Sequence, residues 1–437
     1  LFAEEVGRAL GEDVKRFVVS THTMALAKQL DHWLERGSPM SSELREMLKD
    51  AEPVALPCRL MLHRENRPGL EAAKRLPALL EQAGEETGEK RTRELERLVR
   101  RALAPDSKTG ETAPLEAYYA LLMMDGDRLG AWLSGDMDGA SYRECFHPKV
   151  RSGFDARARQ NPRLQQYGAQ PRAVSPNRHL AISAALNDFA LHVVSEVVER
   201  EHSGRVIYAG GDDVLAMLPA ADLVAAMQRL RRAYSGDDPA NADRDWRQAQ
   251  RESGLFIKDG FGLLRGRLMR LMGKKATASC GAVIAHHQAP LAAVLRELRA
   301  AEQRAKSEGR RDAWSLTLIK RSGGTVQLTA KWGAPLDTLT AMSDFLADRE
   351  VSRRAVYNTL EWIKDLPSDN HGPIEALFAY QLQRQAEGDA RSRAPDLARR
   401  LIKIAFNPEL RPQTARPVEW LRDFLIGAEF LAREVRR

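Results

Sequence analysis

The sequence predicts an α+β fold in which a ferredoxin-like sheet, with helices on one face, lies between two helical domains. Two observations lead to this prediction. Short apolar runs alternate with helical patterns in the middle of the chain, whereas apolar residues recur every three or four positions before and after it. The expected domains are an N-terminal helical domain (residues 1–114), a sheet domain (115–333) and a C-terminal helical bundle (334–437).

The N-terminal domain is expected to be helical. Met24, Leu26, Leu30 and Leu34 follow helical spacing, and residues 94–101 form a charged stretch typical of a solvated helix face. Residues 105–114 (PDSKTGETAP) concentrate turn-forming and polar residues, which marks the domain boundary.

The sheet domain begins with an apolar run at residues 118–124 (YYALLMM), which predicts a buried strand. A long amphipathic helix follows at 180–199, with Ser175 as its cap and Pro176 at its first position. The runs RVIY and VLAML flank A-G-G-D-D at 209–213 and predict a β-hairpin with the glycines in its turn. Further helices are expected at 221–234 and 290–307, and further strands at 277–285, 314–319 and 325–328.

Two long insertions interrupt this order, at residues 134–171 and 236–275. Long connections in a compact domain are usually functional or mobile. In the second insertion, basic residues are interleaved with Leu and Met at a spacing that predicts a helix with one apolar and one cationic face. This face would suit an RNA backbone, and a solvated surface explains it equally well. The residues concerned are Arg265, Arg267, Arg270, Lys274 and Lys275.

Four acidic residues carry the chemistry expected of the sheet domain. Asp125 and Asp127 follow the first strand, and Asp212 and Asp213 lie at the hairpin turn. In a ferredoxin-like sheet these two segments are neighbours, so their carboxylates would converge and repel unless a divalent cation held them together. Oxygen ligands without His or Cys favour Mg²⁺ or Mn²⁺, which are the ions of phosphoryl and nucleotidyl transfer.

Five other residues are expected to bind a nucleotide near these carboxylates. Gly210 and Gly211 would let a base or phosphate approach the backbone and would allow a positive φ angle. Lys306, at the end of a helix, would reach phosphate oxygens, and Ser183 and Asn187 would touch ribose or base. The plainer alternatives are a tight turn with solvated carboxylates and a surface lysine favoured by the helix dipole.

Composition narrows the class of protein. The 437 residues carry 67 Lys and Arg against 60 Asp and Glu, a net charge of +7, which permits a nucleic-acid or nucleotide partner. No run approaches the roughly 18 apolar residues of a membrane-spanning helix, so a membrane protein is not expected. Cys58, Cys145 and Cys280 form no C-x-x-C pair, and no secretion signal is visible. We therefore expect a cytoplasmic protein without a thiolate zinc site.

Three segments together resemble the large signature subunit of type III CRISPR RNA-guided effector complexes, in its Cmr subtype. They are residues 118–130 (YYALLMMDGDRLG), 175–189 (SPNRHLAISAALNDF) and 205–218 (RVIYAGGDDVLAML). The likeness is strongest over residues 115–330. It implies a polymerase/cyclase palm fold for the sheet domain. It also implies an antiviral activity that converts ATP into cyclic oligoadenylate second messengers when target RNA binds.

The resemblance implies a role for each candidate site residue. Asp125, Asp212 and Asp213, with Asp127 beside them, would hold Mg²⁺ or Mn²⁺, and Lys306 would bind ATP phosphates. The 3′-hydroxyl of one ATP would attack the α-phosphate of another and release pyrophosphate. The implied partners are CRISPR RNA, target RNA and other complex subunits, including a small helical subunit against the C-terminal helices.

Departures from the family pattern limit these implications. Many family members carry an N-terminal HD nuclease domain, a first palm and a cysteine zinc cluster, and this sequence contains neither an H-D dyad nor a cysteine cluster. HD nuclease activity is therefore not assigned to these residues. Leu1 corresponds to a point shortly after the zinc cluster, so we expect a truncated or partly ordered protein, with a naturally short form as the alternative. Without the first palm, the pair of palms that binds two ATP molecules would be incomplete.

Two other functions stay open. A diguanylate-cyclase-like enzyme would carry G-G-D-E-F or G-G-E-E-F, and here Asp213 and Val214 replace the Glu and Phe. A non-enzymatic scaffold would hold guide and target RNA through the basic insertion and the C-terminal helices. The intact carboxylate set argues against scaffolding alone, because acids packed together are costly to keep.

Overall fold

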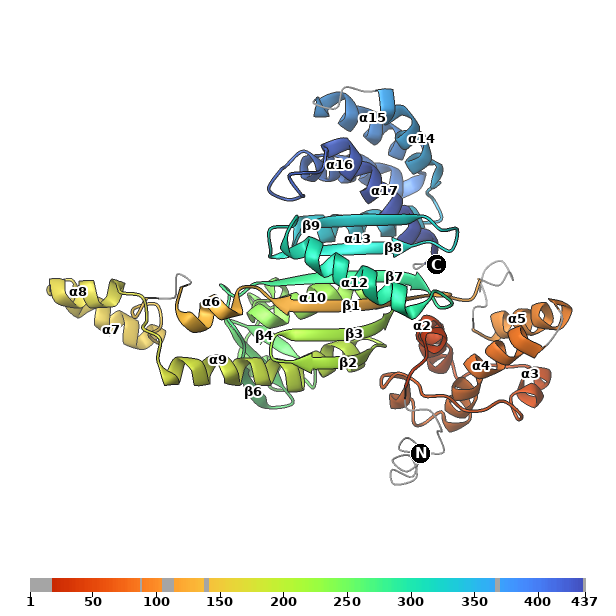
Figure 1. The fold of residues 1–437 in the computed structure, drawn as a ribbon, viewed down its shortest axis with the longest axis horizontal. Coiled ribbons are helices and arrows are strands. Elements are labelled where there is room, and N and C mark those ends of the chain that lie inside the picture. The colour runs from red at the N-terminus through yellow and green to blue at the C-terminus, as the bar shows by residue number, and fades with distance from the viewer. Residues whose placement is uncertain (1–17, 87–88, 104–113, 137–140, 366–369, 435–437) are drawn as a thin grey trace.

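A six-stranded mixed sheet forms the centre of the computed structural model, which describes residues 18–86, 89–103, 114–136, 141–365 and 370–434. The strand order is β2-β3-β1-β7-β8-β9, and only the β7–β8 pair is parallel. Helices pack around this sheet (Figure 1), so the predicted α+β class is confirmed. The strands are β1 (Tyr118–Gly126), β2 (Arg205–Gly210), β3 (Asp213–Pro219), β7 (Ala278–His286), β8 (Ala313–Ile319) and β9 (Thr325–Lys331).

The predicted strand at 118–124 is the central strand β1. It pairs with β3 on one side and with β7 on the other. Ala120 and Leu122 point to one face of the sheet and Tyr119 and Leu121 to the other, and each is at most 1% exposed. A strand that is buried on both faces needs apolar residues at every position, which explains the uninterrupted run in the sequence.

Helices cover both faces of the sheet, so the expectation of helices on one face is wrong. The Leu122 face packs against α9 (Pro176–Asp188), its π-helical continuation to Glu201, and α10 (Leu223–Ser235). The Leu121 face packs against α12 (Leu291–Lys306) and α2 (Thr21–Glu35). Every residue of β7 is buried, and such a strand carries no alternation that would reveal the number of covered faces.

The long helix that begins at α9 is part of this core. Ser175 caps it by accepting a hydrogen bond from the Arg178 backbone N–H, and Pro176 occupies its first turn, as predicted. By length and composition alone, Pro176–Glu201 is the one helix among the described residues that would be able to cross a membrane. However, Phe189 and Val197 are fully buried against the sheet, as in the core helix of a soluble domain.

The N-terminal helices have an apolar core of their own, around Trp33, Leu60 and Leu76. The helix α2 contributes to this core and also to the core under the sheet, where Met24 packs. The predicted boundary segment at 105–114 lies outside the described residues except for Pro114. The remaining helices of this part are α3 (Ser42–Met47), α4 (Arg67–Glu86) and α5 (Glu89–Leu103).

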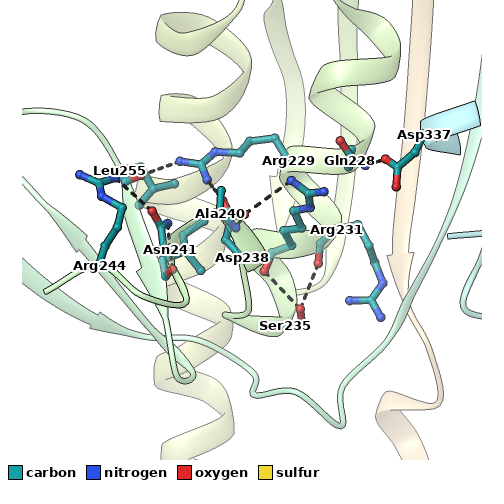
Figure 2. Close-up of polar contacts among 12 residues, drawn as sticks. Gln228, Arg229, Arg231, Ser235, Asp238, Ala240, Asn241, Arg244, Leu255 and Asp337 are labelled. Atoms are coloured by element: carbon teal, nitrogen blue, oxygen red, sulfur yellow. Dashed lines mark hydrogen bonds and ion pairs between the residues drawn. The ribbon is translucent and has the colours of Figure 1, made fainter. Parts of the chain in front are cut away.

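The C-terminal helices share the main core with the sheet. The Trp420 indole donates to the Thr329 carbonyl of β9 at 2.9 Å, and Gln228 of α10 donates to Asp337 of α13 at 2.6 Å (Figure 2). These contacts fix the bundle against the sheet edge and against α10. The helices are α13 (Ala334–Ala347), α14 (Arg354–Trp362), α15 (His371–Arg384), α16 (Gly388–Ala405) and α17 (Pro417–Glu434).

The second insertion forms a small sheet instead of the predicted amphipathic helix. After the short helix α11 (Trp246–Ala249), the strands β4 (Phe256–Lys258), β5 (Phe261–Leu264) and β6 (Arg267–Arg270) pair in antiparallel fashion. The residue pairs Asp259–Gly260 and Arg265–Gly266 join them, and all four φ angles lie between 48° and 81°. Two consecutive positive φ angles are the geometry of type I′ hairpin turns, which Asp-Gly favours.

The α10 helix anchors this second insertion. Arg229 forms ion pairs with Glu201 at 2.9 Å and with Asp238 at 2.6 Å (Figure 2 shows Arg229 and Asp238). The Asn241 amide donates to the Ile257 carbonyl of β4 at 3.0 Å. The second insertion is therefore held to the central sheet domain by buried and half-buried polar contacts.

The first insertion stands away from the sheet. It follows α6 (Leu129–Ser134) and contains α7 (Pro148–Ala158) and α8 (Pro162–Ala169), which lie at the left end of the molecule in Figure 1. An isolated bridge between Ser141 and Pro171 closes its base. We call residues 141–172 the arm.

Candidate active site

The end of β1, the turn between β2 and β3, and the last turn of α12 meet at one edge of the sheet. Met124 of β1 pairs with Val214 of β3, so Asp125 comes beside Asp213. Gly210 pairs with Asp213, which leaves Gly211 and Asp212 as the turn. The structure thus brings together Asp125, Asp212 and Asp213, which we call the acid cluster.

The carboxylates of the acid cluster perturb one another. Burial, and then the hydrogen bond and charge of Asp125, raise the pKa of Asp213 to about 6. Burial also raises the pKa of Asp212, where the charge of Asp125 adds to the effect and backbone N–H groups of Asp212 and Gly126 oppose it. Both shifts have the sign expected for like charges gathered in a partly desolvated site.

Lys306 places an ammonium group among these carboxylates. Its Nζ contacts Asp125 Oδ2 directly and lies 2.5 Å from Glu302 Oε1, one helical turn earlier on α12. Although burial lowers the pKa of Lys306, the hydrogen bonds to Asp125 and Glu302 raise it overall, so the side chain is a cation. About a quarter of the side chain is exposed, so it remains accessible to a ligand.

Two residues that the sequence reasoning missed, Gly126 and Tyr234, lie directly beside the acid cluster. Gly126 follows Asp125, and a Cβ atom there would lie 2.2 Å from the Tyr234 hydroxyl oxygen and 2.8 Å from Asp212 Oδ2. Burial, followed by the charges of Asp212 and Asp125, raises the pKa of Tyr234 above its usual range. Tyr234 therefore remains a neutral phenol beside the acid cluster, and only glycine fits at position 126.

Asp127 forms its hydrogen bonds with residues outside the acid cluster. It is 5% exposed and accepts hydrogen bonds from Ser279 Oγ at 2.7 Å, Thr277 Oγ1 at 2.8 Å and the Asp312 backbone N–H at 2.9 Å. Arg231 of α10 in turn pairs with Asp312 at 2.7 Å. Both Asp127 oxygens are thus engaged in joining the end of β1 to β7 and to the segment before β8.

The predicted nucleotide-binding residues take different positions. Gly211 has a φ angle of 65° and open space around it, as the turn requires, while a Cβ atom on Gly210 would meet the Tyr208 ring. Ser183 and Asn187 are exposed on α9, and within the described residues they make no hydrogen bond or ion pair with the acid cluster.

Most of the predicted RNA-binding residues of the second insertion are paired with carboxylates of this chain. Arg267 lies 3.1 Å from Asp188, Lys274 lies 3.1 Å from Asp237, and Lys275 lies 3.7 Å from Glu144. Arg265 contacts the buried carboxylate of Glu196. Arg270 is exposed on β6, and its backbone N–H donates to Asp188. The strongly cationic helical face expected from the sequence is therefore absent from this part of the described chain.

The donor chemistry of the acid cluster fits a hard divalent cation. Its ligand atoms are carboxylate oxygens, and a cation would relieve the repulsion that raises the pKa values of Asp212 and Asp213. Across the described ranges, no three His, Cys, Asp or Glu side chains are already arranged around one point as a metal site. In this structure the Lys306 ammonium supplies the positive charge at Asp125.

Residues 118–249 match the family model of the second palm domain of Cas10/Cmr2. The chain is 31% identical over 207 residues to the CRISPR system Cmr subunit Cmr2 of Pyrococcus furiosus, which covers 47% of this chain and 19% of that protein. It is 32% identical over 127 residues to the CMR subunit Cmr2 of Saccharolobus solfataricus, which covers 28% of this chain and 11% of that protein.

The whole chain also resembles solved structures. A chain of the type III-B Cmr-beta complex in its apo state matches with a TM-score of 0.60 and 17% identity, covering 98% of this chain and 48% of that chain. The Cmr-beta complex bound to cognate target RNA matches with a TM-score of 0.60 and 17% identity, covering 97% and 49%. At this identity the likeness concerns the fold alone, and the chain spans less than half of each relative.

The family match covers β1, the β2–β3 hairpin and α10, which carry the acid cluster and Tyr234. The part of the sheet that carries the acid cluster therefore matches the second palm domain of the Cas10/Cmr2 family, and the chain resembles the large subunit of the Cmr-type, type III CRISPR effector complex.

Proposed function

We propose that this chain is the palm-bearing part of a type III CRISPR effector subunit that synthesises cyclic oligoadenylates from ATP when target RNA is bound. The observation that carries the proposal is the convergence of Asp125, Asp212, Asp213 and the Lys306 ammonium at one edge of the sheet. Carboxylates paired with a phosphate-binding cation are the constellation of nucleotidyl transfer.

In the proposed reaction the 3′-oxygen of one adenosine forms a bond to the α-phosphorus of an ATP. The bond between the α-phosphorus and the bridging oxygen to the β-phosphate breaks, pyrophosphate leaves with that electron pair, and the 3′-hydroxyl proton passes to solvent water. A divalent ion held by the acid cluster would supply positive charge to the phosphates and lower the pKa of the attacking hydroxyl.

The residues of this chain have separate tasks in that reaction. Asp125, Asp212 and Asp213 provide the oxygen ligands, and their repulsion favours uptake of a cation. Lys306 exchanges its contact with Asp125 for the triphosphate and neutralises part of the leaving group's charge. The open space at Gly211 admits the nucleotide close to the backbone of the turn.

The test is incubation of the assembled complex with ATP, Mg²⁺ or Mn²⁺ and complementary target RNA, followed by mass spectrometry of the products. The informative variant is Asp212→Asn/Asp213→Asn, which removes two charges without changing side-chain size. Asp50→Asn/Asp243→Asn is the matched control, because both of those carboxylates are exposed and lie in loops outside the site.

Cyclic adenylates from the wild type and the control, and none from the site variant, are the expected result. Retained RNA binding with no adenylate product from any of the three would refute the synthase and favour a scaffold that holds guide and target RNA. Replacing ATP by GTP in the same assay tests the diguanylate-cyclase alternative.

A further inference from the structure

The arm carries positive charge that is not paired with carboxylates of this chain. Residues 141–172 contain seven Lys and Arg but only two acidic residues, Glu144 and Asp155. Both acids are already engaged: Asp155 takes two hydrogen bonds from Arg143, at 2.6 and 2.7 Å, and Glu144 accepts from the Ser141 backbone N–H and lies near Lys275. No acid in the arm is left to neutralise its other basic residues.

Four of those basic side chains point to solvent: Lys149, Arg157, Arg159 and Arg163. Within the described chain, none of them forms an ion pair or a side-chain hydrogen bond. They lie on α7, on α8 and at the turn between them, so one short segment presents four cationic groups. Three exposed glutamines and Asn161 in the same segment add further hydrogen-bonding groups.

The arm is nevertheless folded. The rings of Tyr142 and Tyr167 stack with centroids 4.7 Å apart and an angle of 19° between their planes. At its base, the buried Arg178 donates to the Arg172 carbonyl at 3.1 Å and to the Trp132 carbonyl at 3.0 Å. The backbone that carries the cationic groups therefore has a defined conformation, which lowers the entropy lost when a ligand binds.

An aromatic face lies next to the basic groups. Tyr167 is 44% exposed and sits one helical turn after Arg163 on α8, while its other face rests on Tyr142. Guanidinium groups beside an exposed, supported ring are the combination that binds single-stranded nucleic acid, with phosphates on the cations and a base on the ring. An acidic peptide would use the cations and leave the ring without a partner.

The arm is also joined to the strand that carries the acid cluster. The chain enters the arm through α6, directly after β1 has delivered Asp125 to the site, and returns from it into α9. Figure 1 shows α7 and α8 beyond the end of the sheet where β1 leads into α6. A strand held by the arm would pass near the edge of the sheet that carries the acid cluster.

We propose that the arm is a binding surface for single-stranded RNA, in which Lys149, Arg157, Arg159 and Arg163 contact the phosphate backbone and Tyr167 stacks on a base. The recognition of a phosphate backbone follows from the arm itself, and the choice of RNA over DNA rests on the proposed function. The arm is placed outside the nucleotide-transfer site, so its loss leaves the acid cluster intact.

The test measures binding of a labelled single-stranded RNA to the purified chain by fluorescence anisotropy, without ATP, at several salt concentrations. The variant is Lys149→Glu/Arg163→Glu. Both positions lie in the first turn of a helix, where a carboxylate is favoured by the helix dipole, so the arm keeps its fold. Arg296→Glu/Arg299→Glu on the exposed side of α12 is the control with the same change in net charge.

The arm variant should bind RNA on the order of tenfold more weakly near physiological salt, and the slope of log K against log salt should fall by about 1.4, at about 0.7 per lost phosphate contact. The control should bind as the wild type does. Equal losses in both variants, or no loss in the arm variant, would overturn the proposal.

A DNA strand of the same sequence, measured in parallel, identifies the polymer. Tighter binding of RNA that is lost in the arm variant supports the proposal, and arm-dependent binding of DNA alone overturns it. Because ATP is absent, failure of the arm proposal is distinguishable from failure of the synthase proposal, which is read from cyclic products.

Discussion

Substitution of Asp127 should destabilise the protein in the absence of any metal, whereas substitution of Asp125 should not. Asp127 is buried and accepts three hydrogen bonds, from Thr277, Ser279 and Asp312. Asp125 is 27% exposed, and its charge raises the pKa of Asp213. The two carboxylates, one near the end of β1 and one just after it, thus contribute differently to stability.

The magnitude follows from the hydrogen-bond geometry at Asp127. In Asp127→Asn the amide oxygen can still accept from Thr277 and from the Asp312 N–H, while the NH₂ group donates to the Ser279 hydroxyl. The loss is then the charge assistance of these bonds, about 1 kcal/mol. Asp127→Ala leaves the Asp312 N–H and two hydroxyl groups without their acceptor, and should cost about 3 kcal/mol or more.

Urea unfolding in EDTA, followed by circular dichroism, measures these differences. We expect the free energy of unfolding to be lowest for Asp127→Ala, higher for Asp127→Asn and highest for the wild type. For Asp125→Asn, which relieves repulsion at Asp213, the free energy of unfolding should change by no more than about 0.5 kcal/mol. If Asp127→Ala were as stable as the wild type in EDTA, and weaker than the wild type only when Mn²⁺ is added, the structural assignment would be refuted. Asp127 would then be a metal ligand, as the sequence predicted.

Two further predictions concern the site and the N-terminal contact. Gly126→Ala should abolish adenylate synthesis but retain RNA binding, because the new methyl group overlaps the Tyr234 hydroxyl and Asp212; mass spectrometry and anisotropy measure the two readouts. Burial, and then the imidazole of His22, lower the pKa of His287 to about 3, and the rings stack at 4.3 Å. As the pH falls, His287 therefore binds a proton in the unfolded chain before it does so in the folded chain. The free energy of unfolding should then decrease below about pH 6.5, by at most about 1.4 kcal/mol per pH unit, and this histidine should not affect it above that pH. Urea unfolding at several pH values should show this slope reduced in His287→Phe, and an unchanged slope would contradict the assignment.

The hairpin and strand predictions succeeded because their signals are local. A-G-G-D-D between two apolar runs specifies a turn and the register of β2 with β3. Asp213 comes beside Asp125 through the separate pairing of β3 with β1. The second insertion contained an equally local signal: the Asp259–Gly260 dipeptide indicates a hairpin, although the Leu and Met spacing suggested a helix. A short run of apolar residues fits the spacing of a helix and that of a strand equally well, so the residues that favour a turn were the better guide to the structure of this insertion.

Tyr234 and Glu302 were not predictable in this way. Each reaches the site from a helix on a different face of the sheet, and the sequence does not show which face a helix covers when the strands are apolar on both. The spacing of Glu302 and Lys306, one helical turn apart, was a visible hint that the lysine would have a local partner.

The distribution of free positive charge depends on contacts that are remote in the sequence. Arg265 meets a carboxylate 69 positions away and Arg267 one that is 79 positions away, so no local count of charges would have shown that they are neutralised. The arm differs because it projects from the body and brings only two acids with it. Lys149, Arg157, Arg159 and Arg163 form no ion pair with a distant carboxylate of the described chain, which leaves them available for the polymer that we propose the arm binds.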